Sequence, residues 1–294
     1  MQLANIKINN FIVLRSLSTL SLLPNNSYVN TNASFVSGEE VSFTCTRVTK
    51  NDEYYELAWA YPEEVALLTS ITIGAHPDFG KVSFFPARWP VYVVDEGQDL
   101  SDMKFLTAAE SLLRAQLTEN VRMNSWEELP PFLTLRPYSF NGNLHLPKVY
   151  QLKLLHLIDI NDSLMIRGLV HLLKTSMLRC LSRSFIDTAC LEIYVALEAT
   201  LEIILRKLRS KGVLNPSNKD ASDYLLQSFG ESYRLEKYYQ EYYEDRIRAI
   251  HPNSRFGPAK FPPLFVDDLF MLYNDLLRTY EFLITAQPNS YEIT

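Results

Sequence analysis

Hydrophobic and polar positions in the first half of the chain change over short distances, and turns interrupt them often. The segment Val41–Val48 alternates between apolar and polar residues, which predicts a half-buried strand. Leu106–Leu117 has the spacing of a short amphipathic helix. Segments rich in Asn and Pro predict turns, among them Pro86 to Pro90. Further apolar runs predict strands over residues 6–13, 68–73, 82–85, 91–94 and 132–136. We therefore expect an α+β fold for residues 1–150.

The pattern changes near residue 150 to longer segments whose apolar residues recur three and four positions apart. Asn161 or Ser163 caps the first helix that this pattern predicts, and Ser184 and Asp187 have the spacing of a capping box at the start of the second. The second helix is apolar almost all round, so we expect it to be the most buried one. The predicted helices cover residues 163–181, 184–211, 220–229, 231–251 and 264–284. Residues 151–294 are thus expected to form an all-α bundle.

The predicted helix over residues 231–251 carries an arginine on its apolar face. With residues placed at about 100° each, Arg246 lies near the middle of a stripe of leucine, tyrosine and isoleucine residues that includes Tyr239. A guanidinium on a packing face is costly unless a partner compensates its charge. The residue before a proline disfavours helical backbone, so His251, which precedes Pro252, should end this helix. The pattern predicts Arg-x4-His at a helix C-terminus.

Glu198 is a candidate partner for Arg246. It lies one turn before Glu202 in the helix that should be the most buried. Either Glu198 pairs with Arg246 inside the bundle, or both glutamates reach solvent along a thin polar edge. One sequence does not fix the rotation of a helix, so both alternatives stay open.

The helix over residues 163–181 has only basic charged residues. Arg167, Lys174 and Arg179 lie within it, and Arg183 follows directly. These residues could track phosphate groups, or they could form a solvated face whose aliphatic stems cover apolar neighbours. We favour the solvated face, because charge runs usually serve that purpose.

Composition limits the classes of function. The chain has 294 residues and a formal net charge of −6, so general adhesion to nucleic acid, and DNA binding in particular, is not expected. The acidic excess lies in residues 1–150, with 11 Lys/Arg against 16 Asp/Glu, whereas residues 151–294 carry 17 against 18. Three cysteines without paired spacing suit a reducing compartment, and no zinc pattern occurs. No run is typical of a signal peptide or a membrane span, so we expect a cytoplasmic protein without membrane partners.

The helix end at residues 246–251 carries a resemblance to a known family. The spacing Arg246-x4-His251 resembles the R-x4–6-H motif of HEPN domains (higher eukaryotes and prokaryotes nucleotide-binding). The tyrosine-rich helix that leads into Arg246, Arg248 and His251 is most similar to the Apea-like subgroup. The resemblance covers roughly the C-terminal 110 to 130 residues, within the usual uncertainty of such boundaries. The sequence departs from many nuclease members at Ile247, where they carry a small or polar residue.

The resemblance implies a metal-independent endoribonuclease without cofactors, in which the 2′-hydroxyl attacks the adjacent phosphate. Arg246 would hold the phosphate and His251 would transfer protons, roles that suit a permanently charged guanidinium and an imidazole that titrates near neutrality. It further implies a homodimer whose two motifs share one cleft, and a context of defence or stress. Arg248, Asn253, Ser254 and Arg255 are expected to bind substrate. A non-catalytic module that binds a nucleotide, RNA or a protein is the alternative, and a dimerising scaffold is the third.

Overall fold

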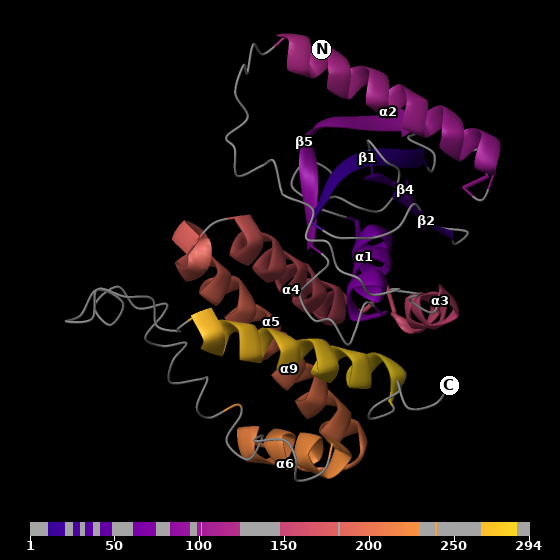
Figure 1. The fold of residues 1–294 in the computed structure, drawn as a ribbon. Helices are drawn as coiled ribbons and strands as arrows, with labels where there is room; N and C mark the ends of the chain where they lie inside the picture. The colour runs from indigo at the N-terminus through magenta and orange to yellow at the C-terminus, as the bar shows by residue number, and fades with distance from the viewer. Residues whose placement is uncertain are drawn as a thin grey trace, which may run out of the picture. The chain divides into compact units, whose positions relative to one another are not determined.

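The computed structural model describes residues 11–20, 26–29, 33–37, 42–48, 61–74, 83–94, 99–100, 102–123, 148–181, 183–229, 239 and 266–286. The chain divides into two units (Figure 1). The first comprises Met1–Ala75 and Lys81–Leu152, and the second comprises His76–Gly80 and Lys153–Thr294. The first unit holds the described strands and two helices, and the second is helical. An α+β region therefore precedes a helical one, as the hydrophobic pattern predicted.

The first unit contains a five-stranded antiparallel sheet in the order β2-β3-β4-β1-β5. Its bounds are β1 Phe11–Leu20, β2 Asn26–Val29, β3 Ala33–Ser37, β4 Ser42–Val48 and β5 Ser83–Val94. The strand predicted over residues 41–48 is confirmed as β4, in the centre of the sheet between β3 and β1. The runs over residues 82–85 and 91–94 belong to one strand rather than two, because β5 continues through them.

The turn predicted at Pro86 to Pro90 is wrong for a reason that the sheet makes clear. β5 is an edge strand, where a missing backbone N–H need not interrupt the ladder. Its pairing with β1 shifts register between Arg15 and Leu17, whose partners are Val91 and Pro86. The prolines therefore mark a bulge within one strand.

Two helices, α1 (Pro62–Gly74) and α2 (Met103–Met123), contact the sheet through opposite faces of β4 (Figure 1). Phe43 and Cys45 pack in one core with residues of α2. The intervening Thr44 faces α1, where its hydroxyl donates a 2.6 Å hydrogen bond to Glu64. Thr44 and Thr46 are both buried, so the polar face of this strand meets a helix and not solvent. The expectation of a half-buried strand is thus wrong.

The strand predicted over residues 68–73 is also wrong, since this run lies within α1. All of α1 from Glu63 to Gly74 is buried. A helix buried all round has no amphipathic period, so a short apolar run of this kind resembles a buried strand. The hydroxyls of Ser70 and Thr72 donate to the carbonyls of Leu67 and Leu68, which lets polar side chains lie inside a buried helix.

The division between the units falls within α3 (Lys148–Leu157), and the second unit continues with longer helices. These are α4 (Ser163–Leu181), α5 (Ile186–Ser210), α6 (Asn218–Phe229) and α9 (Val266–Thr285), with a 3₁₀ turn, η1 (Arg183–Phe185), before α5. Asp162 caps α4 by accepting from the backbone N–H groups of Leu164 and Met165. Neither Asn161 nor Ser163 therefore provides the cap that the sequence suggested.

The N-cap of α5 also differs from the Ser184 that the sequence suggested. Phe185 is the N-cap, without a side-chain hydrogen bond, and the 3₁₀ turn takes up the residues around Ser184. At the other end, Gly212 has a φ of +89°, and the N–H of Val213 donates to the carbonyl of Leu208. The left-handed glycine and this hydrogen bond form a Schellman motif, which ends many helices. A box of the expected kind does begin α6, where Ser217 and Asp220 exchange hydrogen bonds.

α5 is the central helix of the second unit, because it packs against α4, α6 and α9. The prediction that this helix is central is confirmed, and a row of buried residues extends along it from Ile186 to Leu208. Gly168 of α4 and Tyr280 of α9 meet α5 beside Ala196 and Ala199. The fully buried Tyr280 hydroxyl donates a 2.7 Å hydrogen bond to the Ala196 carbonyl.

Candidate functional site

The residues predicted to carry the chemistry lie outside the part of the chain that the structure describes. Both expected catalytic residues, Arg246 and His251, fall within residues 240–265, outside the described ranges. The same holds for the expected substrate-binding residues, Arg248, Asn253, Ser254 and Arg255, and for Ile247. Their roles stay predictions, and the described site consists of the helices that would support them.

Tyr239 is the described residue of the predicted tyrosine-rich helix. It is helical and buried, as its position on the predicted apolar face requires. Its hydroxyl lies 3.1 Å from Oγ1 of Thr200 on α5. The Thr200 hydroxyl itself donates to the carbonyl of Leu197, so Tyr239 is the donor in this pair. This hydrogen bond ties residue 239 to α5.

Tyr239 and Tyr280 form a buried pair of phenols against α5. Burial raises the pKa of the Tyr239 hydroxyl, which the hydrogen bond with Thr200 opposes. Burial also raises the pKa of Tyr280, and the neighbouring Tyr239 adds to that effect. Both hydroxyls therefore stay neutral near pH 7, where they act as hydrogen-bond donors inside the bundle.

Two glutamates of α5, one turn apart, lie on its exposed side. Glu198 and Glu202 are both exposed, which agrees with the alternative of a polar edge. Glu202 accepts a 2.7 Å hydrogen bond from Arg209, and both side chains are about half exposed (49% and 50%). Such a pair adds little to stability. The pairing of Glu198 with Arg246 stays a prediction, because Arg246 is not among the described residues.

The basic residues of α4 are not equivalent in the structure. Arg179 lies over the rings of Phe270 and Tyr273 of α9, with its guanidinium carbon 5.0 Å and 5.2 Å from their centres. It packs between α4 and α9 through cation–π contacts. One face of α4 instead carries Arg167, which is exposed, and Lys174, which is partly buried.

A histidine that the sequence reasoning passed over lies on that same face of α4. The Nδ1 atom of His171 is 2.5 Å from Oε2 of Glu192 on α5. Both side chains are partly buried, each with 20% of its surface exposed. An imidazole held by a carboxylate is a common arrangement where a histidine is to be kept in one orientation. Nothing in one sequence pairs residues 171 and 192, because the contact depends on how α4 and α5 are rotated.

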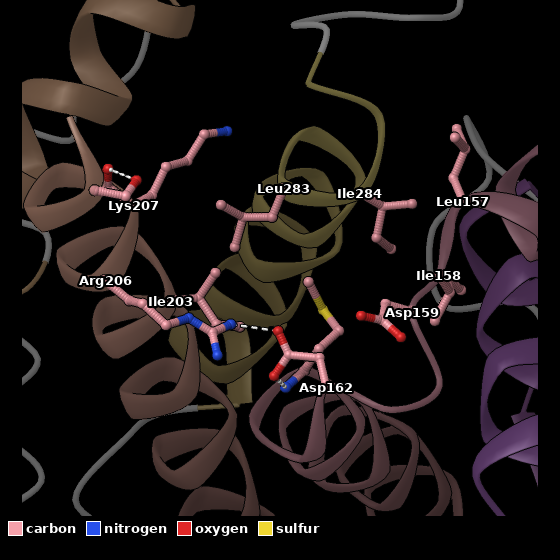
Figure 2. Close-up of a pocket in the computed structure, with 11 residues that line it drawn as sticks. Leu157, Ile158, Asp159, Asp162, Ile203, Arg206, Lys207, Leu283 and Ile284 are labelled. Carbon is pink, nitrogen blue, oxygen red and sulfur yellow. Dashed lines mark hydrogen bonds and ion pairs between the residues drawn. The ribbon is translucent and has the colours of Figure 1, made fainter.

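The second unit contains a hollow of about 310 Å³ between the start of α4, the end of α5 and the end of α9 (Figure 2). Arg206 and Asp162 point toward each other there and form an ion pair. Lys207 extends away from this pair toward the rings of Tyr224 and Phe282. The lining residues are Leu157, Ile158, Asp159, Asp162, Met165, Ile203, Arg206, Lys207, Ser210, Leu283 and Ile284.

The charges of this hollow are engaged within the protein. Burial alone would raise the pKa of Asp162, but hydrogen bonds from Arg206, Met165 and Leu164 and the charge of Arg206 lower it instead. Asp162 is therefore ionised and serves as a helix cap and an ion-pair partner. The Ser210 hydroxyl donates to the carbonyl of Lys207. The hollow thus offers an apolar surface with satisfied polar groups, and these groups do not form an acid–base pair for catalysis.

Within the described ranges, no group of three or more His, Cys, Asp or Glu residues could hold a metal ion. In the same part of the chain, no helix combines the length and apolar character needed to cross a membrane. Comparisons with protein-family models, with curated proteins and with solved structures found no match.

Proposed function

We propose that this protein is a metal-independent endoribonuclease of the HEPN type, with Arg246 and His251 as its catalytic pair. The observation that carries the proposal is the Arg246-x4-His251 spacing. Arg246 follows by seven residues the buried Tyr239, which contacts the helical bundle. The proposal takes RNA as substrate and a homodimer as the active form, in which two motifs line one cleft. The dimer would bring two arginines and two histidines together and create a cationic site on an acidic protein.

The burial of Tyr239 supports the inward position that the proposal needs for Arg246. Residues seven apart in a helix are two turns apart and share a face. Tyr239 is helical and contacts Thr200 of α5, so the face it belongs to is directed at the bundle. On a continuous helix, Arg246 would continue that face. An inward guanidinium needs an anion as partner, and an RNA phosphate would supply one.

The proposed reaction is a phosphoryl transfer within the RNA chain. His251 removes the proton from a ribose 2′-hydroxyl, which then attacks the adjacent phosphorus. The bond to the 5′-oxygen of the next nucleotide breaks, and a histidine, that of the same or the other subunit, returns a proton to this oxygen. Arg246 stabilises the charge that grows on the phosphate in the transition state. The products are a 2′,3′-cyclic phosphate and a free 5′-hydroxyl.

Ile247 favours a second candidate, a non-catalytic module that binds RNA. A bulky apolar residue beside Arg246 would limit the space for a reacting phosphate, although it would leave binding in place. The two candidates differ in one respect that can be measured, since only the nuclease changes the RNA.

The test is incubation of the purified protein with end-labelled single-stranded RNA in the presence of EDTA. We expect cleavage with cyclic-phosphate ends by the wild type, and losses of at least about 100-fold for Arg246→Ala and His251→Ala, as is common when an acid–base or charge-stabilising group is removed. Lys219→Ala, an exposed lysine on α6, serves as the matched control and should cleave normally. Activity that persists in His251→Ala would refute the assigned site. If the wild type and the variants bind the RNA but leave it intact, the non-catalytic binding module is the correct candidate.

A further inference from the structure

Three residues of α4 form a polar stripe on one face of the helix. Arg167, His171 and Lys174 follow each other at intervals of four and three residues, so they point in nearly the same direction. Their backbone positions are about 6 Å and 4.5 Å apart along the helix axis. We call these three residues the α4 stripe.

The two cations of the α4 stripe differ from most other cations of this unit. In the described part of the chain, neither Arg167 nor Lys174 forms an ion pair or a side-chain hydrogen bond. Other arginines and lysines of the helical unit contact carboxylates or aromatic rings: Arg179, Arg206, Lys207, Arg209 and Lys211. Among the described residues, Arg167 and Lys174 therefore have no partner for their charges.

His171 explains why the stripe keeps its charge beside an acidic residue. Glu192 of α5 lies against the stripe, and a long cation within one helical turn of His171 could reach it. The His171 imidazole already binds the Glu192 carboxylate, through the 2.5 Å contact at Nδ1. The histidine thus acts as a positioning residue, which keeps Glu192 from pairing with Arg167 or Lys174.

We propose that the α4 stripe is a second phosphate-binding surface, which holds the backbone of single-stranded RNA outside the cleavage site. Two charges spaced along one helix face suit a chain of phosphates, whereas a single small anion would need them to converge. The identity of the ligand as RNA rests on the proposed function. The stripe itself rests on two cations without a partner in the described ranges and on the His171–Glu192 contact.

The test measures the binding of single-stranded 2′-O-methyl RNA, which lacks the attacking hydroxyl and stays intact. For a single strand, the logarithm of the binding constant falls with the logarithm of salt concentration by about 0.7 per phosphate contact. We expect Arg167→Gln and Lys174→Gln each to reduce this slope by about 0.7 and to weaken binding about fivefold at 0.1 M salt. Lys219→Gln is the matched control and should leave both quantities unchanged. Arg167→Lys, which keeps the charge, should bind like the wild type.

The role of His171 has its own pair of variants. His171→Ala releases Glu192, so binding should weaken about as much as when one cation is removed. His171→Gln keeps a donor toward Glu192 and should preserve binding. Equal binding by both His171 variants would overturn the positioning role.

If the salt dependence of binding for Arg167→Gln and Lys174→Gln matches that of Lys219→Gln, the proposal that the α4 stripe binds phosphates is refuted. If the protein binds RNA through the α4 stripe in a salt-dependent way but does not cleave ordinary RNA, the proposed nuclease activity is refuted and the α4 stripe is supported. Unchanged circular dichroism of Arg167→Gln and Lys174→Gln verifies that the fold is intact.

Discussion

The close approach of α4, α5 and α9 at Gly168 makes a sharp prediction for the substitution Gly168→Ala. A methyl carbon at this position would lie 2.8 Å from Cβ of Ala199 and 2.9 Å from Cζ of Tyr280. It would lie closer still to the Tyr280 hydroxyl oxygen. Tyr280 is fully buried and Ala199 belongs to the central helix, so neither can move aside easily.

The expected loss of stability follows from three contributions. Overpacking of a core costs about 1–3 kcal/mol. Displacing the Tyr280 hydroxyl from the Ala196 carbonyl, 2.7 Å away, adds about 1–3 kcal/mol for an unsatisfied buried group. Replacing glycine by alanine within a helix returns about 1 kcal/mol. The net destabilisation is thus about 3 kcal/mol, a large fraction of the stability of an ordinary domain.

Equilibrium unfolding in urea, followed by far-UV circular dichroism, measures this change. The matched control is Gly168→Ala combined with Tyr280→Phe. Removing the hydroxyl takes away the atom nearest to the new methyl group, so the double substitution should cost about 1–2 kcal/mol less than the sum of the single ones. A Gly168→Ala variant as stable as the wild type, or more stable, would show that helix propensity alone governs this position and that the helices do not approach as closely as described.

Three further predictions concern other buried groups. Burial raises the pKa of Asp275 from its ordinary 3.8 to about 6, against the opposing charge of Arg278, so its cost to stability is absent below pH 4 and complete above pH 6. Asp275→Asn should therefore stabilise the protein by up to about 3 kcal/mol at pH 7.5 and hardly at pH 4 in urea unfolding; equal effects at both pH values would contradict this. Burial raises the pKa of the Cys45 thiol, so iodoacetamide should modify Cys45 at pH 8 only after unfolding, as mass spectrometry would detect. Thr44→Val removes the donor to the buried Glu64 and should cost about 1–3 kcal/mol, whereas the exposed Ser111→Ala should be neutral.

The helices with one apolar face could be predicted closely from the sequence. α4 ends at Leu181, as expected, and begins at Ser163, within the range of the two expected caps; α9 begins at Val266, two residues after the expected start. In both, the helical period of apolar residues records which side is buried. The same rule failed for α1, because a helix that is buried all round leaves no period to detect. The edge strand β5 was divided in two because its prolines signal a turn, although a bulge accommodates them.

The candidate sites depend on information that a single sequence does not contain. The hollow of the helical unit draws its residues from three separate segments, around Asp162, Arg206 and Leu283. Those segments meet only through tertiary packing, which a single sequence does not show. His171 and Glu192 are 21 positions apart on two helices, and their contact requires a particular rotation of each. Arg246 and His251 were accessible to sequence reasoning because they are five positions apart in one predicted helix end.

The contact between Tyr239 and Thr200 separates two ways in which the proposed nuclease could fail. The hydroxyl of Tyr239 lies inside the bundle, against α5, and its pKa is raised by burial, so it serves packing and not proton transfer. A loss of cleavage that comes with a lower unfolding midpoint would therefore indicate a loosened helix, because the support of Arg246 and His251 would have moved. A loss of cleavage at an unchanged midpoint would indicate the chemistry of Arg246 and His251 themselves. The Tyr239–Thr200 contact is seven residues from Arg246 in the sequence. Unfolding midpoints and cleavage rates, both measured on Arg246→Ala and His251→Ala, can therefore distinguish the two cases.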